Sequence, residues 1–598
     1  MSLAAHPDDE DGATLAYYRK IENMKAVSVF FTRGEGGQNE IGSELYAELA
    51  SIRTRETREA SKLLGTDICF LGFPDFGFSK TAKETFVKWG GEEKVLEKLV
   101  YAIRSVKPDV IITNHDTVTT GPRRQHGNHQ AVGITAYRAI EKAADPKYHP
   151  EQLRNGATPW RVRKLFFRIG GSSPDTLRDS LVRINAQQPF TPTENIEELA
   201  WRALSQHHSQ GMAKMTIDSI PMQFRRHWYR LVKADHDYGY DDDDLFVGLT
   251  PLVRNSALPK EASDAMEYRF SMFVSPDHTS AGTERRAPGK QPVVRPVVLT
   301  LINPTGNSLK IEVLAHAGSV RVFQKSYSMA GLPDERLIDT LNMHLEDIPA
   351  REKTVRFVAA AKGASGQSAS ANAEILLKPL AGSYSKDAFA GLVRTYDNTL
   401  QETMQTYDIR FSLIDSTMLA FGNLDQFSVI LLDIRAYAYR PDAVLYNSRL
   451  LEYARNGGNI VVFYQKTGDW NGKNVAPYPL RITGERVTEE DAPVTVLLPE
   501  HPLLSLPNRI TEKDWSDWMQ ERNIYLPSDD TAMTSGNYQR LLAMSDEGEH
   551  QPSTSLLWAK VDKGSYTYVS LALYRQLRNL QDGAVKLFFN MISQPANR

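Results

Sequence analysis

The chain has 598 residues, a length at which one hydrophobic core gives way to several, so we expect two to four domains. Its composition is that of an ordinary globular protein, with 41% hydrophobic residues, 24% charged residues and a net charge of -3, and it gives no reason to expect nucleic acid or a membrane surface as a partner. No apolar run reaches the roughly 20 residues of a spanning helix, and a single cysteine, Cys69, excludes an internal disulfide.

The start of the chain bears on its compartment. The stretch MSLAA is only about half a strand long, and neither a charged leader region nor an apolar signal core precedes His6. We therefore expect that the natural product begins upstream, and we favour an exported full-length protein, periplasmic or in the cell envelope, over a cytoplasmic one.

The first quarter of the chain alternates between short apolar strands and helices. An opening strand precedes a helix over residues 11–22, and three strands and three helices follow. These are strand 24–32, helix 43–65 with Gly65 as its stop, strand 67–73, helix 92–106, strand 108–114 and helix 130–140. Nearly continuous apolar strands alternating with helices predict a Rossmann-like parallel sheet covered on both faces.

Polar loops follow the carboxyl end of each of these strands, where function gathers in parallel α/β sheets. His6 follows the first strand, RGEGGQN (33–39) the second, PDFGF (74–78) the third and HDTVTTGPRRQHGNH (115–129) the fourth. The pattern predicts that all four loops converge on one edge of the sheet.

The middle of the chain changes character twice. From about 190 to 250 the pattern is helical and polar, and the acidic run 241–244 lacks the spaced ligands of a calcium loop, which favours a solvated turn over a calcium site. Between about 265 and 380 five short segments have a hydrophobic period of two, which predicts a small antiparallel sandwich. We expect 280–291 and 362–372 to be loops within it.

From about residue 388 the alternation of strands and helices returns. Apolar segments at 391–397, 408–415, 427–434, 457–464 and 565–573 predict a second, flavodoxin-like α/β domain. The fold class is therefore α/β multidomain. The expected domains are a parallel-sheet domain over 1–255, a central antiparallel β-sandwich over 265–382 and the second α/β domain over 388–598.

The motif AHPDDE places one histidine and two aspartates at the end of the first strand. A helix cap explains one of these acids, and Glu10 suits the first turn of the helix that follows. Catalytic zinc usually keeps three ligands of the histidine or carboxylate kind and one water, so a third ligand is required from a neighbouring loop. HGNH supplies it, because His126 and His129 lie on nearly the same side of a helix and only one need bind metal.

AHPDDE (5–10) followed by HGNH (126–129) resembles the LmbE-like or PIG-L family of metal-dependent de-N-acetylases. The resemblance also includes TRGEGG (32–37), the stretch 53–65 and LGFPDFG (71–77), and it covers roughly residues 1–250. It implies a general base, Asp8, an acid or charge stabiliser, His126, and ligands to Zn2+, or alternatively Fe2+, from His6, Asp9 and His129. It further implies that Arg53, Asp75 and, where some members carry tyrosine, Arg124 contact the substrate.

Further polar residues outside the expected ligand set have structural or substrate-contacting roles as alternatives. We expect Glu35 to organise its own loop, and Asp116 to orient a metal ligand from the second layer of contacts. His207 and His208, in SQHHSQG, resemble a segment of larger multidomain members, and a substrate-wall role competes with a structural one.

The resemblance implies a hydrolase that removes the N-acetyl group from an N-acetylglucosamine-containing sugar or glycoconjugate. The alternatives are an amidase acting on another amide and a catalytically silent glycan-binding envelope protein. The oligomeric state is not predicted.

The last domain resembles glutamine-amidotransferase-like folds through FSVILLDIRAY (427–437), RNGGNIVVFY (455–464) and HPLLSLPNRI (501–510). An active member needs a nucleophilic cysteine. The chain's one cysteine, Cys69, lies in strand 67–73, so composition excludes the glutaminase reaction and predicts a non-catalytic partner domain. Whether the sandwich is a spacer or a carbohydrate-binding module stays open.

Overall fold

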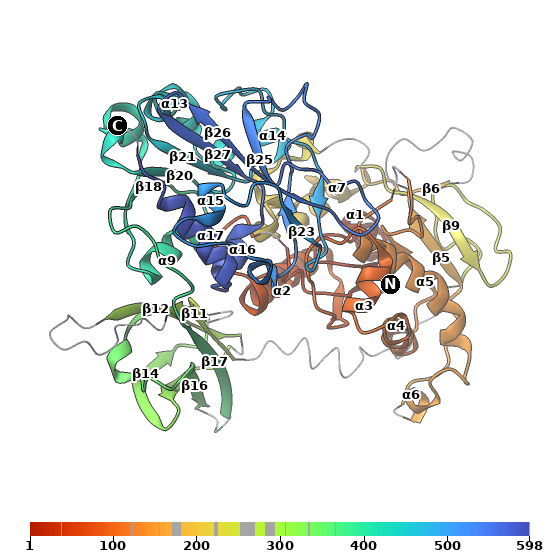
Figure 1. The fold of residues 1–598 in the computed structure, drawn as a ribbon. Helices are drawn as coiled ribbons and strands as arrows, with labels where there is room; N and C mark the ends of the chain where they lie inside the picture. The colour runs from red at the N-terminus through yellow and green to blue at the C-terminus, as the bar shows by residue number, and fades with distance from the viewer. Residues whose placement is uncertain are drawn as a thin grey trace. The chain divides into compact units, whose positions relative to one another are not determined.

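The structure is a computed structural model. It describes residues 1–37, 39–121, 124–154, 156–169, 181–220, 225–250, 270–280, 293–304, 306–332, 335–364, 366 and 368–596. The chain forms two compact units, Met1–Glu267 and Tyr268–Arg598 (Figure 1). The second unit holds both the sandwich and the second α/β sheet. The expected boundaries at 255 and 265, and all of the expected loop 280–291 after its first residue, lie outside the described residues.

The described part of the N-terminal unit is built on a seven-stranded sheet in the order β3-β2-β1-β4-β5-β9-β6. Its strands are β1 (Ser2–Ala4), β2 (Val27–Phe30), β3 (Asp67–Phe70), β4 (Val110–Thr113), β5 (Lys164–Arg168), β6 (Leu181–Arg183) and β9 (Trp228–Ala234). The first five pair in parallel, which confirms the predicted parallel sheet, and β9 pairs antiparallel with β5 and β6. The stretch from about 190 to 250, expected to be helical and polar, contains helical elements but also β9 and the short hairpin β7 (Pro189–Thr191) and β8 (Glu194–Asn195).

Helices cover both faces of this sheet. They are α1 (Gly12–Lys20), α2 (Tyr46–Leu64), α3 (Ala82–Lys88), α4 (Glu92–Val106), α5 (Gly127–Ala144), α6 (Pro150–Arg154), α7 (Ile196–Leu204) and the single turns η2 (His208–Gln210), η3 (Met212–Lys214) and η4 (Ile217–Ser219). Ile111 of β4 packs in the cluster formed with α4 and α5, whereas its neighbours Val110 and Ile112 pack with α1. Because successive side chains of a strand point to opposite faces, α1 covers the face opposite α4 and α5, and α2 and α7 pack on α1.

One helix end follows directly from the sequence, because Gly65 ends α2 with a φ of +78°, as its position predicts. The expectation that Asp8 or Asp9 caps the first helix and that Glu10 lies in its first turn was wrong. The helix α1 begins later, at Gly12, so Asp11 is its cap and accepts a hydrogen bond from the backbone of Thr14.

The second unit contains the predicted sandwich. Its strands are β10 (Ser271–Ser275), β11 (His278–Ser280), β12 (Val294–Asn303), β13 (Leu309–Ala317), β14 (Val320–Met329), β15 (Glu335–His344), β16 (Thr354–Gly363) and β17 (Ser368–Lys378), with the turn η5 (Leu345–Asp347). They form the sheets β10-β12-β15 and β11-β17-β16-β13-β14, antiparallel except for the β11–β17 pair, and Leu299, Val313 and Phe357 join them in one core. The expectation of a loop over 362–372 was wrong, because most of this stretch continues β16 and β17, where pairing between the two strands outweighs the low strand propensity of alanine.

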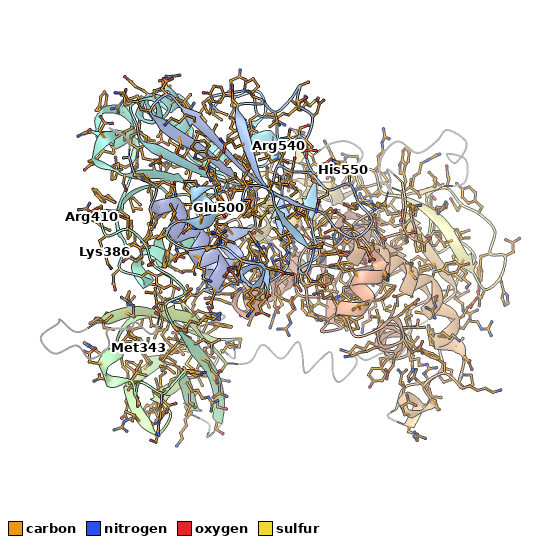
Figure 2. All side chains as sticks on the ribbon, viewed as in Figure 1. Met343, Lys386, Arg410, Glu500, Arg540 and His550 are labelled. Carbon is orange, nitrogen blue, oxygen red and sulfur yellow. The ribbon has the colours of Figure 1, made fainter. Side chains whose placement is uncertain are left out.

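The second α/β sheet has the order β19-β18-β20-β21-β27-β26-β25-β23. Its strands are β18 (Phe389–Val393), β19 (Arg410–Leu413), β20 (Val429–Leu432), β21 (Asn459–Phe463), β23 (Val494–Val496), β25 (Tyr538–Met544), β26 (Leu556–Val561) and β27 (Gly564–Val569), beside the pair β22 (Arg486–Val487) and β24 (Asn523–Ile524). The neighbouring strands β19, β18, β20, β21 and β27 pair in parallel. Arg410, labelled in Figure 2, belongs to the edge strand β19. Its guanidinium lies 4.4 Å from the ring centre of Phe389.

Short helices surround this second sheet. They are α9 (Thr399–Thr406), α10 (Ser416–Phe421), α11 (Ala436–Tyr439), α12 (Pro441–Leu445), α13 (Asn447–Arg455), α14 (Thr467–Trp470), α15 (Pro502–Ser505), α16 (Leu573–Arg578), α17 (Asp582–Ile592) and the turns η6 (Leu424–Gln426) and η7 (Glu512–Trp515). Among the described residues of the whole chain, none of the helices has both the length and the apolar character needed to cross a bilayer. Cys69 is buried in β3, and burial raises the pKa of its thiol to about 12, which fits an inert core residue.

Candidate metal-binding active site

The loop after β1 brings the predicted metal ligands together. Oδ2 of Asp9 lies 3.0 Å from Nδ1 of His6 and 3.2 Å from Nε2 of His129, which stands in the first turn of α5. The backbone N–H of His6 also donates to Oδ2 of Asp9, at 2.8 Å. One carboxylate thus lies within 3.2 Å of a ring nitrogen of each of two imidazoles at the carboxyl edge of the sheet.

The chemistry of these three donors fits a metal cation. Nε2 of His129 is buried and makes no hydrogen bond of acceptable geometry, despite the nearby carboxylate, so its lone pair is available to a metal. Burial lowers the pKa of His6, but the carboxylates of Asp75 and Asp9 outweigh this effect and raise the pKa to about 9. The acidic surroundings therefore favour positive charge where a metal would bind.

Two further histidines lie in the same cluster. Among the described residues, His115 groups with Asp9 and His129, and His126 groups with His6 and His129, at ligand-like separations. Nε2 of His115 accepts a hydrogen bond from the backbone N–H of Ala5 at 3.0 Å, so the lone pair of this nitrogen is already engaged. The ring of His115 also stacks 4.1 Å from that of His129. This geometry favours His115 as a support for the loop after β1 (residues 5–10), which we call the metal loop.

His126 is the N-cap residue of α5, and its ring lies 3.7 Å from that of His129. Its Nδ1 is buried without a hydrogen-bond partner. Burial, followed by the electrostatic effect of the neighbouring His129, lowers the pKa of His126 well below its usual range. A neutral imidazole in this position has a ring N–H to donate to a substrate oxygen.

Asp8 stands beside the ligands without joining them. Its backbone has a φ of +88°, and its side chain is half-buried on the wall of a cavity. Burial and the neighbouring charge of Asp9 raise the pKa of the Asp8 carboxyl well above its usual range. A raised pKa makes this carboxylate a stronger proton acceptor.

The three residues predicted to contact substrate occupy different environments. Oδ1 of Asp75, which is buried, lies 3.9 Å from Nε2 of His6. Arg53 is 3% exposed and donates to the carbonyl of Gly34 and, at 3.2 Å, to Oγ of Ser209. Arg124 is exposed on the loop before α5. The structure thus brings Asp75 to the metal cluster, places Arg53 beneath the loop at Gly34 and leaves Arg124 at the surface.

Two asparagines that were not predicted from the sequence as site residues contact the cluster. Nδ2 of Asn128 lies 3.1 Å from Nε2 of His6, and its Oδ1 accepts a hydrogen bond from Thr85. Asn114 donates through its side chain to the backbone carbonyl of Asp9. Asp116, which was expected to orient a ligand, accepts a hydrogen bond from the backbone of Val118. Asn128 lies inside the HGNH motif, and this position was the sequence feature from which its contact with the cluster could have been predicted.

The segment SQHHSQG fastens the metal loop from a distance in sequence. Gln210 donates through its side chain to the carbonyl of Pro7 at 2.7 Å, and Ser209 donates through its backbone N–H and hydroxyl to Glu56 at 2.7 and 2.6 Å. His207 is buried, and burial together with the charge of Arg53 lowers its pKa to about 3, whereas His208 is exposed. Neither histidine lines the cavity described below.

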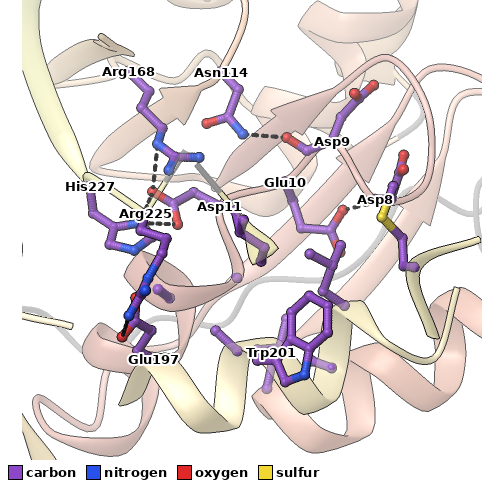
Figure 3. Close-up of a pocket in the computed structure, with 18 of the residues that line it drawn as sticks. Asp8, Asp9, Glu10, Asp11, Asn114, Arg168, Glu197, Trp201, Arg225 and His227 are labelled. Atoms are coloured by element: carbon purple, nitrogen blue, oxygen red, sulfur yellow. Dashed lines mark hydrogen bonds and ion pairs between the residues drawn. The ribbon is translucent and has the colours of Figure 1, made fainter. Parts of the chain in front are cut away.

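A cavity of about 540 Å³ opens beside the cluster (Figure 3). At one end it is lined by Asp8, Asp9, Glu10, Asn114 and His129, and burial raises the pKa of Glu10 to about 7. The cavity therefore reaches both the predicted general base and two of the predicted metal ligands.

Asp11 is the centre of a buried network behind this loop (Figure 3). Its carboxylate accepts hydrogen bonds from Nδ1 of His227 at 2.7 Å and from the hydroxyl of Tyr229 at 2.6 Å, and it lies 3.4 Å from Nε of Arg168. Burial opposes ionisation, but Arg168 and His227 hold the pKa of Asp11 below its usual range. This charged carboxylate ties the start of α1 to β5 and β9.

Comparison with known proteins finds similarity to deacetylases in the N-terminal part of the chain. Residues 1–140 match the family model described as PIG-L: GlcNAc-PI de-N-acetylase. The 1D-myo-inositol 2-acetamido-2-deoxy-alpha-D-glucopyranoside deacetylase of Geodermatophilus obscurus is 27% identical over 296 residues, which cover 42% of this chain and 97% of that protein. The protein named deacetylase 1 for the same compound in Catenulispora acidiphila is 28% identical over 299 residues, covering 42% and 88%.

Among solved structures, N,N'-diacetylchitobiose deacetylase of Pyrococcus horikoshii is 20% identical, with 36% of this chain and 71% of that chain covered and a TM-score of 0.26. The family match and the named relatives support a hydrolytic de-N-acetylase enzyme with a PIG-L family domain in its N-terminal part. This confirms the resemblance drawn from AHPDDE and HGNH. The glutamine-amidotransferase-like resemblance of the last domain stays a prediction.

Proposed function

We propose that the N-terminal unit is a metal-dependent hydrolase that removes the N-acetyl group from an N-acetylglucosamine-containing sugar or glycoconjugate. The observation that carries the proposal is the meeting of His6, Asp9 and His129 beside Asp8, a carboxylate that stays outside the ligand set. The relatives are named as deacetylases of a 2-acetamido-2-deoxy-glucopyranoside, which supports this substrate class.

His6, Asp9 and His129 are the residues that would hold the metal. Two imidazoles and one carboxylate suit Zn2+ and also Fe2+, and we propose Zn2+ because the reaction is a hydrolysis without electron transfer. When bound, such an ion supplies Lewis acidity and makes water a competent nucleophile near neutral pH.

The chain's own residues move the protons. Asp8, in its carboxylate form, accepts a proton from the attacking water and then delivers one to the amine nitrogen that leaves. His126 donates a ring N–H to the acetamide oxygen as negative charge develops there. His126 takes this role as a neutral imidazole, because burial lowers its pKa well below the usual range.

Substrate contacts are part of the same proposal. Asp75, close to His6, is placed to accept a hydrogen bond from a sugar hydroxyl. Arg53 acts on substrate by holding the loop at Gly34, and Arg124 contacts it from the solvent side.

Replacing Asp8 with asparagine tests the assignment. The variant should keep stoichiometric metal, because all three ligands remain, and should lose about a hundredfold to ten-thousandfold in turnover. Metal analysis and acetate release from a panel of N-acetylglucosamine conjugates measure both quantities. Asp67→Asn, at an exposed position on β3, is the matched control and should behave as the unsubstituted protein.

The outcomes separate the alternatives. Loss of metal in Asp8→Asn would make Asp8 a ligand and contradict its role as base. Stoichiometric metal in the unsubstituted protein without acetate from any conjugate would favour another amide as substrate, or a binding role.

We propose the three-domain division for the whole chain. The separate N-terminal unit, the sandwich core and the second parallel sheet support it. The last domain is proposed to be a non-catalytic, glutamine-amidotransferase-like partner, because the chain's one cysteine is buried in β3.

A further inference from the structure

The cavity beside the cluster has apolar as well as polar lining. Part of its wall is made of large apolar side chains from α2, α7 and the segment 212–220, with the following members: Leu64, Trp201, Met212, Met215, Ile217 and Ile220. Lys214 and Asp218, on the same two turns, are exposed to solvent. Over 212–220 the apolar side chains therefore face the cavity while charged ones face water, which is the pattern of a built apolar wall.

The charged groups along this part of the cavity are already paired with one another. Asp11 is engaged by Arg168 and His227. Glu197 accepts two hydrogen bonds from Arg225, at 2.6 and 2.8 Å, and these lower the pKa of its carboxyl (Figure 3). These pairs leave apolar contact as the main attraction that the wall offers to a ligand.

We propose that this cavity binds an apolar aglycone, an alkyl or aryl group on the anomeric oxygen of the amino sugar. The inference rests on the proposed function, because the acetamide must lie at the metal cluster. A two-carbon acetyl group leaves most of a cavity of about 540 Å³ unfilled, so the group that fills it is carried by the sugar. Two methionines and a tryptophan suit such a group, since thioether side chains adapt to varied apolar shapes and the indole offers a flat face.

The test compares methyl and octyl N-acetylglucosaminides, as both anomers and below the micelle concentration of the octyl compound. Transfer of a methylene from water is worth about fourfold in affinity, so burial of between two and three methylenes gives about a thirtyfold higher kcat/KM for the octyl compound. Equal values for the two glycosides would overturn the inference and leave the deacetylase intact. A preference for an N-octanoyl over an N-acetyl methyl glycoside would make the acyl chain the occupant and also overturn it.

A charged side chain placed on the apolar wall of the cavity tests where the aglycone binds, and a second charged substitution outside the cavity is its control. Met215→Asp, at a side chain 38% exposed, should lower the octyl-to-methyl ratio of kcat/KM about tenfold. Val87→Asp, on α3 at 70% exposure and outside the cavity, should leave the ratio unchanged. An unchanged ratio in Met215→Asp would contradict the placement of the aglycone.

Calorimetry keeps the inference separate from the proposed function. Acetate from neither glycoside would contradict the proposed function, whereas binding of octyl 2-amino-2-deoxyglucopyranoside is measured without turnover. Binding to the unsubstituted chain that Met215→Asp weakens and Val87→Asp preserves would support the apolar site. Absence of binding to the unsubstituted chain would overturn it.

Discussion

Asp11 is the buried carboxylate on which the start of α1 depends, and its replacement by alanine is expected to destabilise the N-terminal unit. The side chain is 2% exposed and accepts hydrogen bonds from the hydroxyls of Thr14 and Tyr229 and from the ring of His227. Arg168 completes the network as an ion pair. Alanine removes the acceptor and leaves each of these donors without its partner.

The expected loss follows from these contacts. Three hydrogen bonds to a charged acceptor, at about 1.5 kcal/mol each, sum to about 4.5 kcal/mol. Breaking a buried charged network costs about 3–5 kcal/mol of folding stability. This range and the sum of the hydrogen bonds agree on an expected loss of about 4 kcal/mol. Because the pKa of Asp11 is held below its unfolded value of about 3.9, this contribution is present above that pH and is lost as the pH falls further.

Hydrogen exchange by mass spectrometry suits a chain of two units, because it reports the opening free energy segment by segment. Peptides from α1 and β9 should lose about 4 kcal/mol of protection in Asp11→Ala at pH 7, while peptides from Tyr268–Arg598 keep theirs. Asp67→Ala, on β3 with a half-exposed carboxylate 3.4 Å from Lys25, is the control and should change by less than about 1 kcal/mol. Protection of α1 and β9 within about 1 kcal/mol of the unsubstituted protein in Asp11→Ala would refute the reasoning.

Two further predictions concern metal affinity and pH. Asn128→Ala should weaken metal binding about tenfold to a hundredfold, because the His6 ring loses the side chain that orients it. Chelator competition measures the affinity, with Asn185→Ala at an exposed position as the control. Equal affinity in the two variants would contradict the orienting role of Asn128. Burial lowers the pKa of His501 to about 4, so the stability it contributes is present above the unfolded value of about 6.5 and is lost as the pH falls toward 4. Between pH 7 and 4.5 the unsubstituted second unit should lose about 1 kcal/mol more protection than His501→Asn, a figure discounted for partial exposure, and parallel pH curves would argue against it.

Local pattern in the sequence determined much of this protein. The apolar strands alternating with helices gave the parallel sheet, and Gly65 marked the end of α2 because a left-handed residue suits glycine there. The period of two predicted the sandwich. The polar loops after each strand predicted that His6, Asp9 and His129 would lie close together, since parallel strands direct their carboxyl ends to one edge. The resemblance to the PIG-L family selected these three residues as the expected ligands.

Tertiary structure alone decided the surroundings of that cluster. Gln210 reaches Pro7 across 203 positions, and the apolar wall of the cavity comes from α7, η3 and η4, whose sequence reads as a polar helical stretch. Hydrophobic periodicity reports which face of an element is buried, but it does not report which distant element covers that face. For this reason the expected ligands could be named from the motifs and the family resemblance, whereas the contacts of Asn128 and Asp11 and the lining of the cavity became visible only in the folded structure.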